Sequence, residues 1–142
     1  MLLRIKRLDP NIDLPAPASG GAAGFDLAVA ADVEIPPRQI RLVGTGLVIA
    51  VPSGHFLGIF ARSSTPLKRG LMVANGVGVV DADYCGPGDE VKVQVLNITD
   101  TPVLLKRGDR IAQGIVLPAP RVEWQEVAEM ETPTRGGFGS TG

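Results

Sequence analysis

The amino-acid sequence predicts an all-β domain of the sandwich or jelly-roll kind. Short apolar runs recur along it at a spacing of roughly 8–12 residues, which is typical of such folds. Eighteen glycines and 12 prolines interrupt these runs, and they are too many for a helical bundle. With 142 residues, 44% of them hydrophobic, the chain is long enough for one domain with a buried core. We expect this domain over residues 1–131 and a flexible glycine-rich arm over residues 132–142.

Charge and cysteine content argue against several classes of protein. A net charge of −1 gives no electrostatic case for a nucleic-acid or membrane partner. The only cysteine, Cys85, cannot form an internal disulfide or a cysteine-based zinc cage, and it suits a reducing compartment. Residues 1–7 place charges where a signal peptide needs its apolar core, and no apolar run is long enough to span a bilayer. We therefore expect a soluble, cytoplasmic protein.

The expected strands are apolar stretches, several of them alternating, that end near proline or glycine. The first covers residues 3–8 and ends at Pro10, before an extended loop over residues 14–21. The others are expected at residues 33–35, 40–42, 47–51, 56–61, 71–80, 90–96, 103–105, 111–117 and 122–127. The strands at 71–80 and 90–96 are predicted to form a β-hairpin across a long turn that contains Gly86-Pro87-Gly88.

One short helix is expected over residues 63–69, ended by Gly70. Ser63 or Ser64 can serve as its N-cap, and Pro66 falls in the first turn, where its missing N–H has no cost. Together with Arg62, the two hydroxyls and the backbone N–H groups suit an anion. The alternative is an ordinary helix cap beside a surface arginine.

Two acidic residues, Asp81 and Asp83, follow an apolar run. On a continuing strand they would face the same side, about 6–7 Å apart. Two carboxylates at such a short distance raise each other's pKa, which suits one of them to act as a base near neutral pH. The alternative is a turn that carries two solvated acids.

Two further polar residues lie in apolar surroundings. If Ile111 faces the core, Gln113 also points inward and needs a hydrogen-bond partner. Asp26, between Phe25 and Leu27, is expected to hold its loop through bonds to the backbone.

The glycine-rich arm is the least ordinary segment. No helix follows it, so it is not a P-loop. Ordering even eight such residues would cost on the order of 10 kcal/mol, which only a ligand with many contacts can offset. Phe138 can stack on a base for about 1–3 kcal/mol, while Arg135, Ser140 and Thr141 suit phosphates. The alternative is an unstructured tail.

Five segments of the chain resemble, in order, the five motifs of the homotrimeric dUTPases (dUTP nucleotidohydrolases). The likeness covers nearly the whole sequence, and the ordered set is far more specific than any one motif. The segments are Ala23-Gly24-Phe25-Asp26-Leu27, Ala61-Arg62-Ser63-Ser64, Gly78-Val79-Val80-Asp81-Ala82-Asp83-Tyr84-Cys85-Gly86, Gly108-Asp109-Arg110-Ile111-Ala112-Gln113 and Gly137-Phe138-Gly139-Ser140-Thr141-Gly142.

The resemblance implies a jelly-roll (β-clip) homotrimer whose three active sites are each built from more than one subunit. Such enzymes hydrolyse dUTP to dUMP and pyrophosphate, which limits uracil incorporation into DNA and supplies dUMP for thymidylate synthesis. The resemblance also implies Mg²⁺ held by the triphosphate and waters, with no direct protein ligand. By the same likeness, Asp81 is the general base, Gln113 orients the attacking water, and Asp26 has a supporting role.

The resemblance assigns the remaining site residues to the substrate. Tyr84 would pack under the deoxyribose and leave no room for a 2′-hydroxyl, and Asn75 with the backbone at Val79 and Val80 would recognise uracil. The other implied substrate contacts are Arg62, Ser63 and Ser64 on the phosphates, Phe138 over the base, Arg135, Ser140 and Thr141 on the γ-phosphate, and Gly139. The chain departs from the family in two places. Arg135 stands closer to Phe138 than in the usual Arg-Gly-x-Gly-Gly-Phe arm, and the turn after Tyr84 is longer.

Two other functions remain open. A dCTP deaminase, or a bifunctional deaminase and dUTPase, shares this fold but needs a catalytic glutamate directed at the pyrimidine, and Glu90 is the only acid near the expected place. A non-catalytic nucleotide-sensing regulator would use arm closure to bind a partner. Asp81 and Gln113 favour the enzyme, because a sensor has no need of a base.

Overall fold

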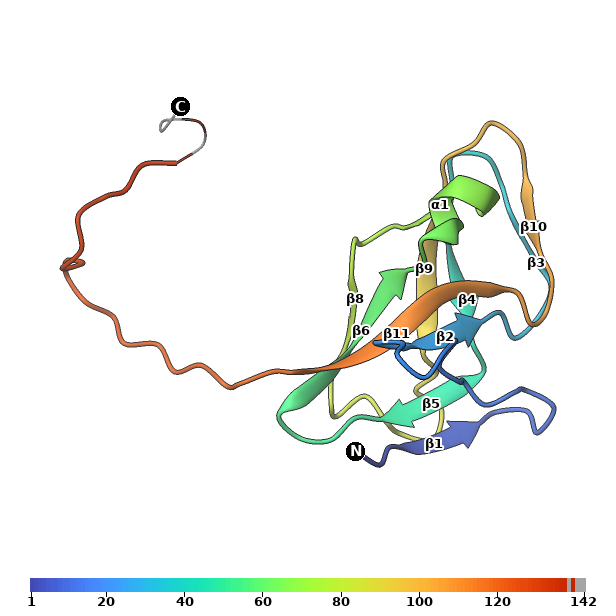
Figure 1. The fold of residues 1–142 in the computed structure, drawn as a ribbon, viewed down its shortest axis with the longest axis horizontal. Helices are drawn as coiled ribbons and strands as arrows, with labels where there is room; N and C mark the ends of the chain where they lie inside the picture. Colours follow the sequence, from blue (N-terminus) through green and yellow to red (C-terminus); the bar gives the residue numbers. More distant parts are fainter. Residues whose placement is uncertain (138, 140–142) are drawn as a thin grey trace.

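The computed structural model describes residues 1–137 and 139 as a β-rich fold with one short helix (Figure 1). This confirms the predicted all-β class. In chain order the elements are β1 (Arg4–Arg7), β2 (Phe25–Ala28), β3 (Val33–Ile35), β4 (Ile40–Gly44), β5 (Leu47–Ala50), β6 (His55–Ala61), α1 (Ser64–Arg69), β7 (Leu71–Val73), β8 (Gly78–Val80), β9 (Lys92–Asn97), β10 (Val103–Leu105) and β11 (Arg110–Pro118).

All the strand pairs are antiparallel. The largest sheet has the order β2-β11-β6-β8 and a second has the order β4-β9-β7, while β1-β5 and β10-β3 form two-stranded sheets. One cluster of buried aliphatic side chains joins them. Alternation is clearest at the start of β9, where Val93 and Val95 are fully buried while Lys92 and Gln94 are exposed. The period-2 pattern therefore identifies correctly which face of this sheet is buried.

The predicted hairpin between residues 71–80 and 90–96 is confirmed only in its outer part, where residues 71–73 pair with residues 95–97, and it is wrong for residues 78–80. The first segment forms two strands, of which β7 pairs with β9 and β8 pairs with β6 in the other sheet. Between them the chain turns at Asn75-Gly76, where Gly76 has φ +75° and its N–H donates to the Val73 carbonyl at 3.0 Å. Asn-Gly is a strong turn signal because both residues tolerate positive φ. The chain therefore passes from one sheet to the other at this turn.

The strand predicted at residues 122–127 is also absent. Residues 119–131 form no strand and run away from the sheets (Figure 1). Trp124 is 92% exposed, and Val122, Val127 and Met130 are also exposed. A single extended segment gains no ladder hydrogen bonds without a partner strand. The described chain offers this segment none of its own.

Helix α1 joins the end of β6 to β7. Gly70 adopts the left-handed conformation at φ +63°, and its N–H donates to the Pro66 carbonyl at 3.1 Å. Ser63 is at the N-cap, but its side chain makes no capping hydrogen bond. The helix is instead held by Thr65, which is fully buried and donates from Oγ1 to the Ile111 carbonyl at 2.8 Å. This bond fixes the beginning of the helix against β11.

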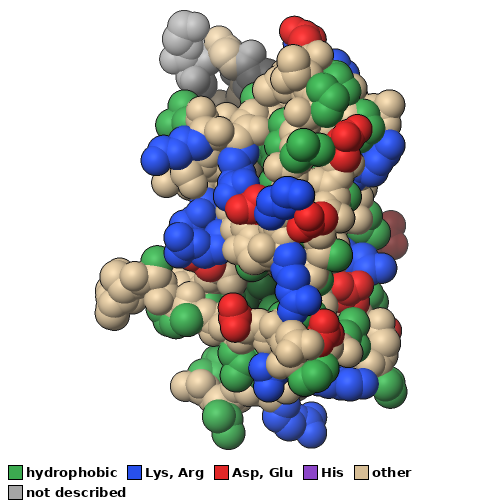
Figure 2. All heavy atoms as spheres, turned by 90° about the vertical axis from the view of Figure 1, so that its right-hand side faces the viewer, with side chains coloured by type: hydrophobic (Ala, Val, Ile, Leu, Met, Phe, Trp, Pro, Cys, Tyr) green, Lys and Arg blue, Asp and Glu red, His purple; other side chains and the backbone are tan. Residues whose placement is uncertain are grey.

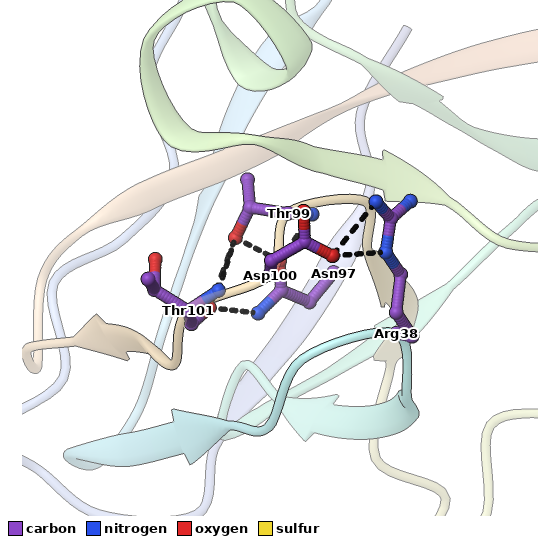
Figure 3. Close-up of polar contacts among 5 residues, drawn as sticks. All are labelled: Arg38, Asn97, Thr99, Asp100 and Thr101. Atoms are coloured by element: carbon purple, nitrogen blue, oxygen red, sulfur yellow. Dashed lines mark hydrogen bonds and ion pairs between the residues drawn. The ribbon is translucent and has the colours of Figure 1, made fainter.

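A fully buried asparagine organises the end of β9 (Figure 3). Asn97 donates from Nδ2 to the Ile35 carbonyl at 2.9 Å and the Thr101 carbonyl at 2.8 Å. Its Oδ1 accepts bonds from the N–H and Oγ1 of Thr99, at 2.9 and 2.8 Å. Every donor and acceptor of this amide is in use, so the side chain ties β3 to the turn between β9 and β10.

Basic and acidic side chains are interspersed on the face shown in Figure 2. Ion pairs that join separate segments include Lys106 with Asp32 at 2.8 Å and Arg69 with Asp109 at 3.0 Å. The hydrogen bond from Arg69 lowers the pKa of Asp109 below its ordinary value, and that from Lys106 does the same for Asp32. Arg69 belongs to α1 and Asp109 precedes β11, so their pair is a second link between these elements. Among the residues described, no helix is both long and apolar enough to cross a bilayer.

Candidate active site

One group of predicted site residues meets at the end of the four-stranded sheet. Asp26 accepts from Arg62 Nε at 2.7 Å and from Arg110 Nη1 at 3.1 Å, and its side chain is only 13% exposed. The expectation that Asp26 bonds to the backbone of its own loop is therefore wrong. Antiparallel pairing of β2 with β11 places Ala28 opposite Arg110 and so brings the guanidinium to the carboxylate. The Asp26 carboxylate thus binds the Nε of Arg62, and the two terminal nitrogens of Arg62 are left to other acceptors.

Gln113 lies in the same place, in β11, opposite Asp26 on one side and Phe60 on the other. The pairing of β11 with β2 is irregular between Arg110 and Ala112, and Ile111 and Ala112 are both fully buried. This irregularity interrupts simple alternation at Ile111 and Ala112, and Gln113 still points partly inward as predicted. Gln113 is half-buried and donates from Nε2 to the Ala61 carbonyl at 3.0 Å. This bond leaves the amide oxygen directed elsewhere.

Ser63 and Ser64 follow Arg62 directly. Ser63 is exposed and Ser64 half-buried. Neither hydroxyl has a hydrogen-bond partner within residues 1–137. The guanidinium and two hydroxyls thus form one polar group beside Gln113.

A second group lies at the far edge of the same sheet. Asn75, Val79 and Val80 line a cleft of about 200 Å³ between β8 and β9, together with Leu42, Ile59, Val73, Gly78, Lys92 and Gln94. Strand β8 pairs only with β6 among the described strands, so its other edge carries backbone N–H and C=O groups that no ladder uses. The cleft is therefore bordered by fixed backbone donors and acceptors.

Asp81 and Asp83 do not lie on a strand. The chain turns after β8, with the Tyr84 N–H donating to the Asp81 carbonyl at 3.2 Å and the Cys85 N–H to the Asp83 carbonyl at 3.0 Å. The predicted placement of both carboxylates on one face of an extended strand is thus wrong. Asp81 is exposed immediately after the cleft-lining Val80, and within the described chain its carboxylate has no ion-pair partner.

The loop after this turn ends at Glu90. The Tyr84 hydroxyl donates to the Glu90 carbonyl at 3.2 Å, and the tyrosine is 41% exposed. The Glu90 side chain is 19% exposed and accepts from the Gly46 N–H at 2.7 Å. It is not among the residues that line the cleft. Its second oxygen, Oε2, pairs with Lys92 Nζ at 3.6 Å, so the carboxylate needed by the deaminase alternative is engaged by the Gly46 N–H and by Lys92.

The two groups cannot meet within one chain. Gln113 is opposite Phe60, and Val80 is opposite Leu57. Val80, directly before Asp81, therefore lies about 10 Å along β6 and about 10 Å across the sheet from Gln113, or about 14 Å between Cα atoms. Two side chains that bind one water have their polar atoms at most about 6 Å apart.

Two parts of the predicted site remain to be placed. Arg135 and Gly139 are exposed, and both follow the end of β11 in a part of the chain that forms no helix or strand. Phe138, Ser140 and Thr141 lie outside the described residues. Across residues 1–137 and 139, no three histidine, cysteine, aspartate or glutamate side chains come together in a way that could hold a metal ion.

Comparison with known proteins identifies the class to which this fold and these residues belong. Residues 10–142 match the family model of the dUTPases. The chain is 44% identical to the deoxyuridine 5′-triphosphate nucleotidohydrolase of Wolinella succinogenes over 144 aligned positions, covering 100% of this chain and 95% of that protein. It is 46% identical to the Thermobifida fusca protein of the same name, covering 99% and 78%. The protein belongs to the dUTPase family.

Solved structures agree with this assignment. The crystal structure of dUTPase from Streptococcus mutans superposes with a TM-score of 0.78 at 37% identity, over 86% of this chain and 98% of that one. The dUTPase of Staphylococcus bacteriophage 80alpha, in complex with dUpNHpp, shares the fold with a TM-score of 0.87 at 23% identity, over 99% and 98% of the two chains. The predicted family and fold class are confirmed.

Proposed function

We propose that the protein hydrolyses dUTP to dUMP and pyrophosphate. The observation that carries this function is the dUTPase match over residues 10–142, which spans all five segments singled out in the sequence. Water attacks the α-phosphorus, a P–O bond forms, and the bond to the β-phosphate oxygen breaks so that pyrophosphate leaves. The water's proton goes to a carboxylate.

We assign that carboxylate to Asp81. It is exposed, has no cation beside it in the described chain, and follows the residues that line the cleft. Gln113 orients the water through its amide oxygen, because its amide nitrogen is bonded to Ala61. Arg62, with Ser63 and Ser64, binds the phosphates. The bond from Asp26 supports this role, since it fixes the guanidinium plane before substrate arrives.

The cleft at β8 suits a pyrimidine. A backbone edge presents a fixed pattern of donors and acceptors, so the uracil edge can pair with it while cytosine would leave groups unpaired. Asn75 adds a side-chain amide at the same place. Tyr84, in the turn after β8, would pack under the sugar and exclude a 2′-hydroxyl.

A shared site in a homotrimer is supported by the separation of the two groups. If Asp81 and Gln113 act on one water, they come from different subunits, because in one chain Gln113 lies about 14 Å from Val80, the residue before Asp81. Ile40, Leu42 and Met72 are about half exposed on the outer face of the β4-β9-β7 sheet, which suits contact with another copy. The arm, with Arg135, Phe138, Gly139, Ser140 and Thr141, would close over the site once the triphosphate is bound.

Mg²⁺ fits this site as an ion carried by the substrate. The Asp26 carboxylate is already bonded to two arginines, and no three suitable side chains meet in the described part of the chain. Triphosphate oxygens and waters would therefore hold the ion, which would supply charge neutralisation at the phosphates. We also propose a cytoplasmic location, supported by the free, exposed Cys85, which suits a reducing compartment.

Pyrophosphate release tests this function. The protein is supplied with Mg²⁺ and, in parallel, with dUTP, dCTP, dTTP or UTP. Release from dUTP alone is expected. Deamination of dCTP would revive the deaminase alternative, and dUTP binding with no release from any nucleotide would favour a sensor.

A further inference from the structure

The side chain of Tyr84 makes one hydrogen bond within the described chain, to the backbone of Glu90. The phenol hydroxyl donates to the Glu90 backbone carbonyl at 3.2 Å, closing the loop that separates the two residues. In the described chain this is the only hydrogen bond that the side chain makes. The orientation of the ring therefore depends on where the carbonyl of Glu90 is held.

Glu90 is itself firmly built into the fold. Its Oε1 accepts from the Gly46 N–H at 2.7 Å, and its carboxylate lies against Gly44, where any larger residue would overlap it. The next residue, Val91, is fully buried and donates to the Leu47 carbonyl at 2.8 Å. The acceptor for Tyr84 is thus fixed on both sides, through the side chain of its own residue and the backbone of the following one.

The other hydrogen bonds of the loop between the two residues lie mostly within the loop itself, such as those from the Asp89 N–H to the Gly86 carbonyl at 3.1 Å and from the Glu90 N–H to the Gly88 carbonyl at 2.8 Å. The Gly86 N–H bonds to Asp89 Oδ2 at 2.7 Å, a contact within the loop itself. Lys6 reaches the Pro87 carbonyl at 2.9 Å, but this contact is solvent-exposed. The anchorage of the Tyr84 ring to the body of the protein therefore runs mainly through Glu90.

We propose that Glu90 is a positioning residue that holds the Tyr84 ring and so sets how strongly the site prefers deoxyribose to ribose. The inference rests on the proposed function, in which that ring packs under the sugar. A ring held in place excludes a 2′-hydroxyl by overlap, whereas a ring free to shift makes room for it. Loss of the anchor consequently weakens discrimination against UTP more than it weakens hydrolysis of dUTP.

The experiment compares Glu90→Ala, Glu90→Gln and Tyr84→Phe with the wild type, using kcat/KM for dUTP and for UTP. Glu90→Ala and Tyr84→Phe are each expected to lower the dUTP-to-UTP ratio about tenfold, as for the loss of one hydrogen bond. Glu90→Gln keeps an amide oxygen for the Gly46 N–H and is expected to stay within about twofold of the wild-type ratio. The double variant that combines Glu90→Ala with Tyr84→Phe is expected to lower the dUTP-to-UTP ratio no more than either single variant, because both changes break the same connection.

The ratio separates positioning from a general loss of stability, because partial unfolding lowers both rates together. An unchanged ratio in Glu90→Ala and Tyr84→Phe would overturn the proposal, as would a loss in Tyr84→Phe alone. Tyr84→Phe removes only an exposed hydroxyl and leaves the ring unchanged. This variant therefore provides the test if Glu90→Ala fails to fold. Wild-type protein that does not hydrolyse dUTP would instead contradict the proposed function, before any variant is compared.

Discussion

Replacing Asp26 with asparagine is expected to lower both stability and substrate binding. The carboxylate bonds to Arg62 at 2.7 Å and Arg110 at 3.1 Å, and asparagine keeps one acceptor oxygen without the charge. An exposed ion pair contributes about 0–1 kcal/mol, whereas breaking a buried one costs about 3–5 kcal/mol. With exposures of 13% for Asp26, 23% for Arg62 and 57% for Arg110, the free energy of unfolding should fall by an intermediate amount, about 1–3 kcal/mol.

The same change should raise KM for dUTP by about tenfold or more, because Arg62 loses the contact that orients it. Denaturant unfolding and steady-state kinetics measure the two effects on one preparation. Asp100→Asn is a matched control, since Asp100 and its partner Arg38 are 84% and 64% exposed. The control should change stability by less than about 1 kcal/mol. An Asp26→Asn protein with wild-type stability and wild-type KM would refute the reasoning.

Three further predictions concern the base, the arm and the link to α1. Asp81→Asn should still bind dUTP, while kcat falls at least about 100-fold because no carboxylate accepts the proton; binding measurements and single-turnover assays test this, and wild-type turnover would refute it. Removal of the residues after Thr134 should cripple hydrolysis and leave the fold intact, as shown by activity and circular dichroism; full activity would mean that the arm is dispensable. The pKa of Asp109 is lowered by Arg69, so the pair's contribution to stability is present above the ordinary pKa of 3.8 and is lost as pH falls through the lower folded value. Unfolding free energies measured against pH should therefore differ between wild type and Asp109→Asn near neutral pH and converge in acid; a constant difference would contradict the ion pair.

Local patterns in the sequence predict most of the strands. Alternation identifies β9, and the glycine at the end of α1 identifies where the helix stops. Patterns of this kind depend on neighbouring residues only, so they survive folding with little change. The family resemblance adds the order of the five segments, which no local pattern contains.

The misses arise where distant parts of the chain decide the outcome. Asp26 finds its partners at Arg62 and Arg110, far along the chain, because of strand pairing that the sequence does not display. No local pattern predicts β2 as a strand, because its short run gains its stability by pairing with β11. The irregularity in β11 interrupts the alternation near Gln113, but the prediction that this side chain points inward and needs a partner is confirmed by its bond to the Ala61 carbonyl. The turn at Asn75-Gly76, by contrast, has a local signal in the sequence, because Asn-Gly is typical of tight turns.

Mixing two inactive variants tests most directly whether each site is shared between subunits. Asp81→Asn and Gln113→Ala would be unfolded together and refolded as a mixture. If one site takes Asp81 from one chain and Gln113 from another, random mixing restores about one quarter of wild-type activity. In about one site in four, the chain that supplies Asp81 and the chain that supplies Gln113 both carry the unmutated residue at that position. Each variant refolded alone stays inactive. A mixture as inactive as its components would contradict a site built from two chains.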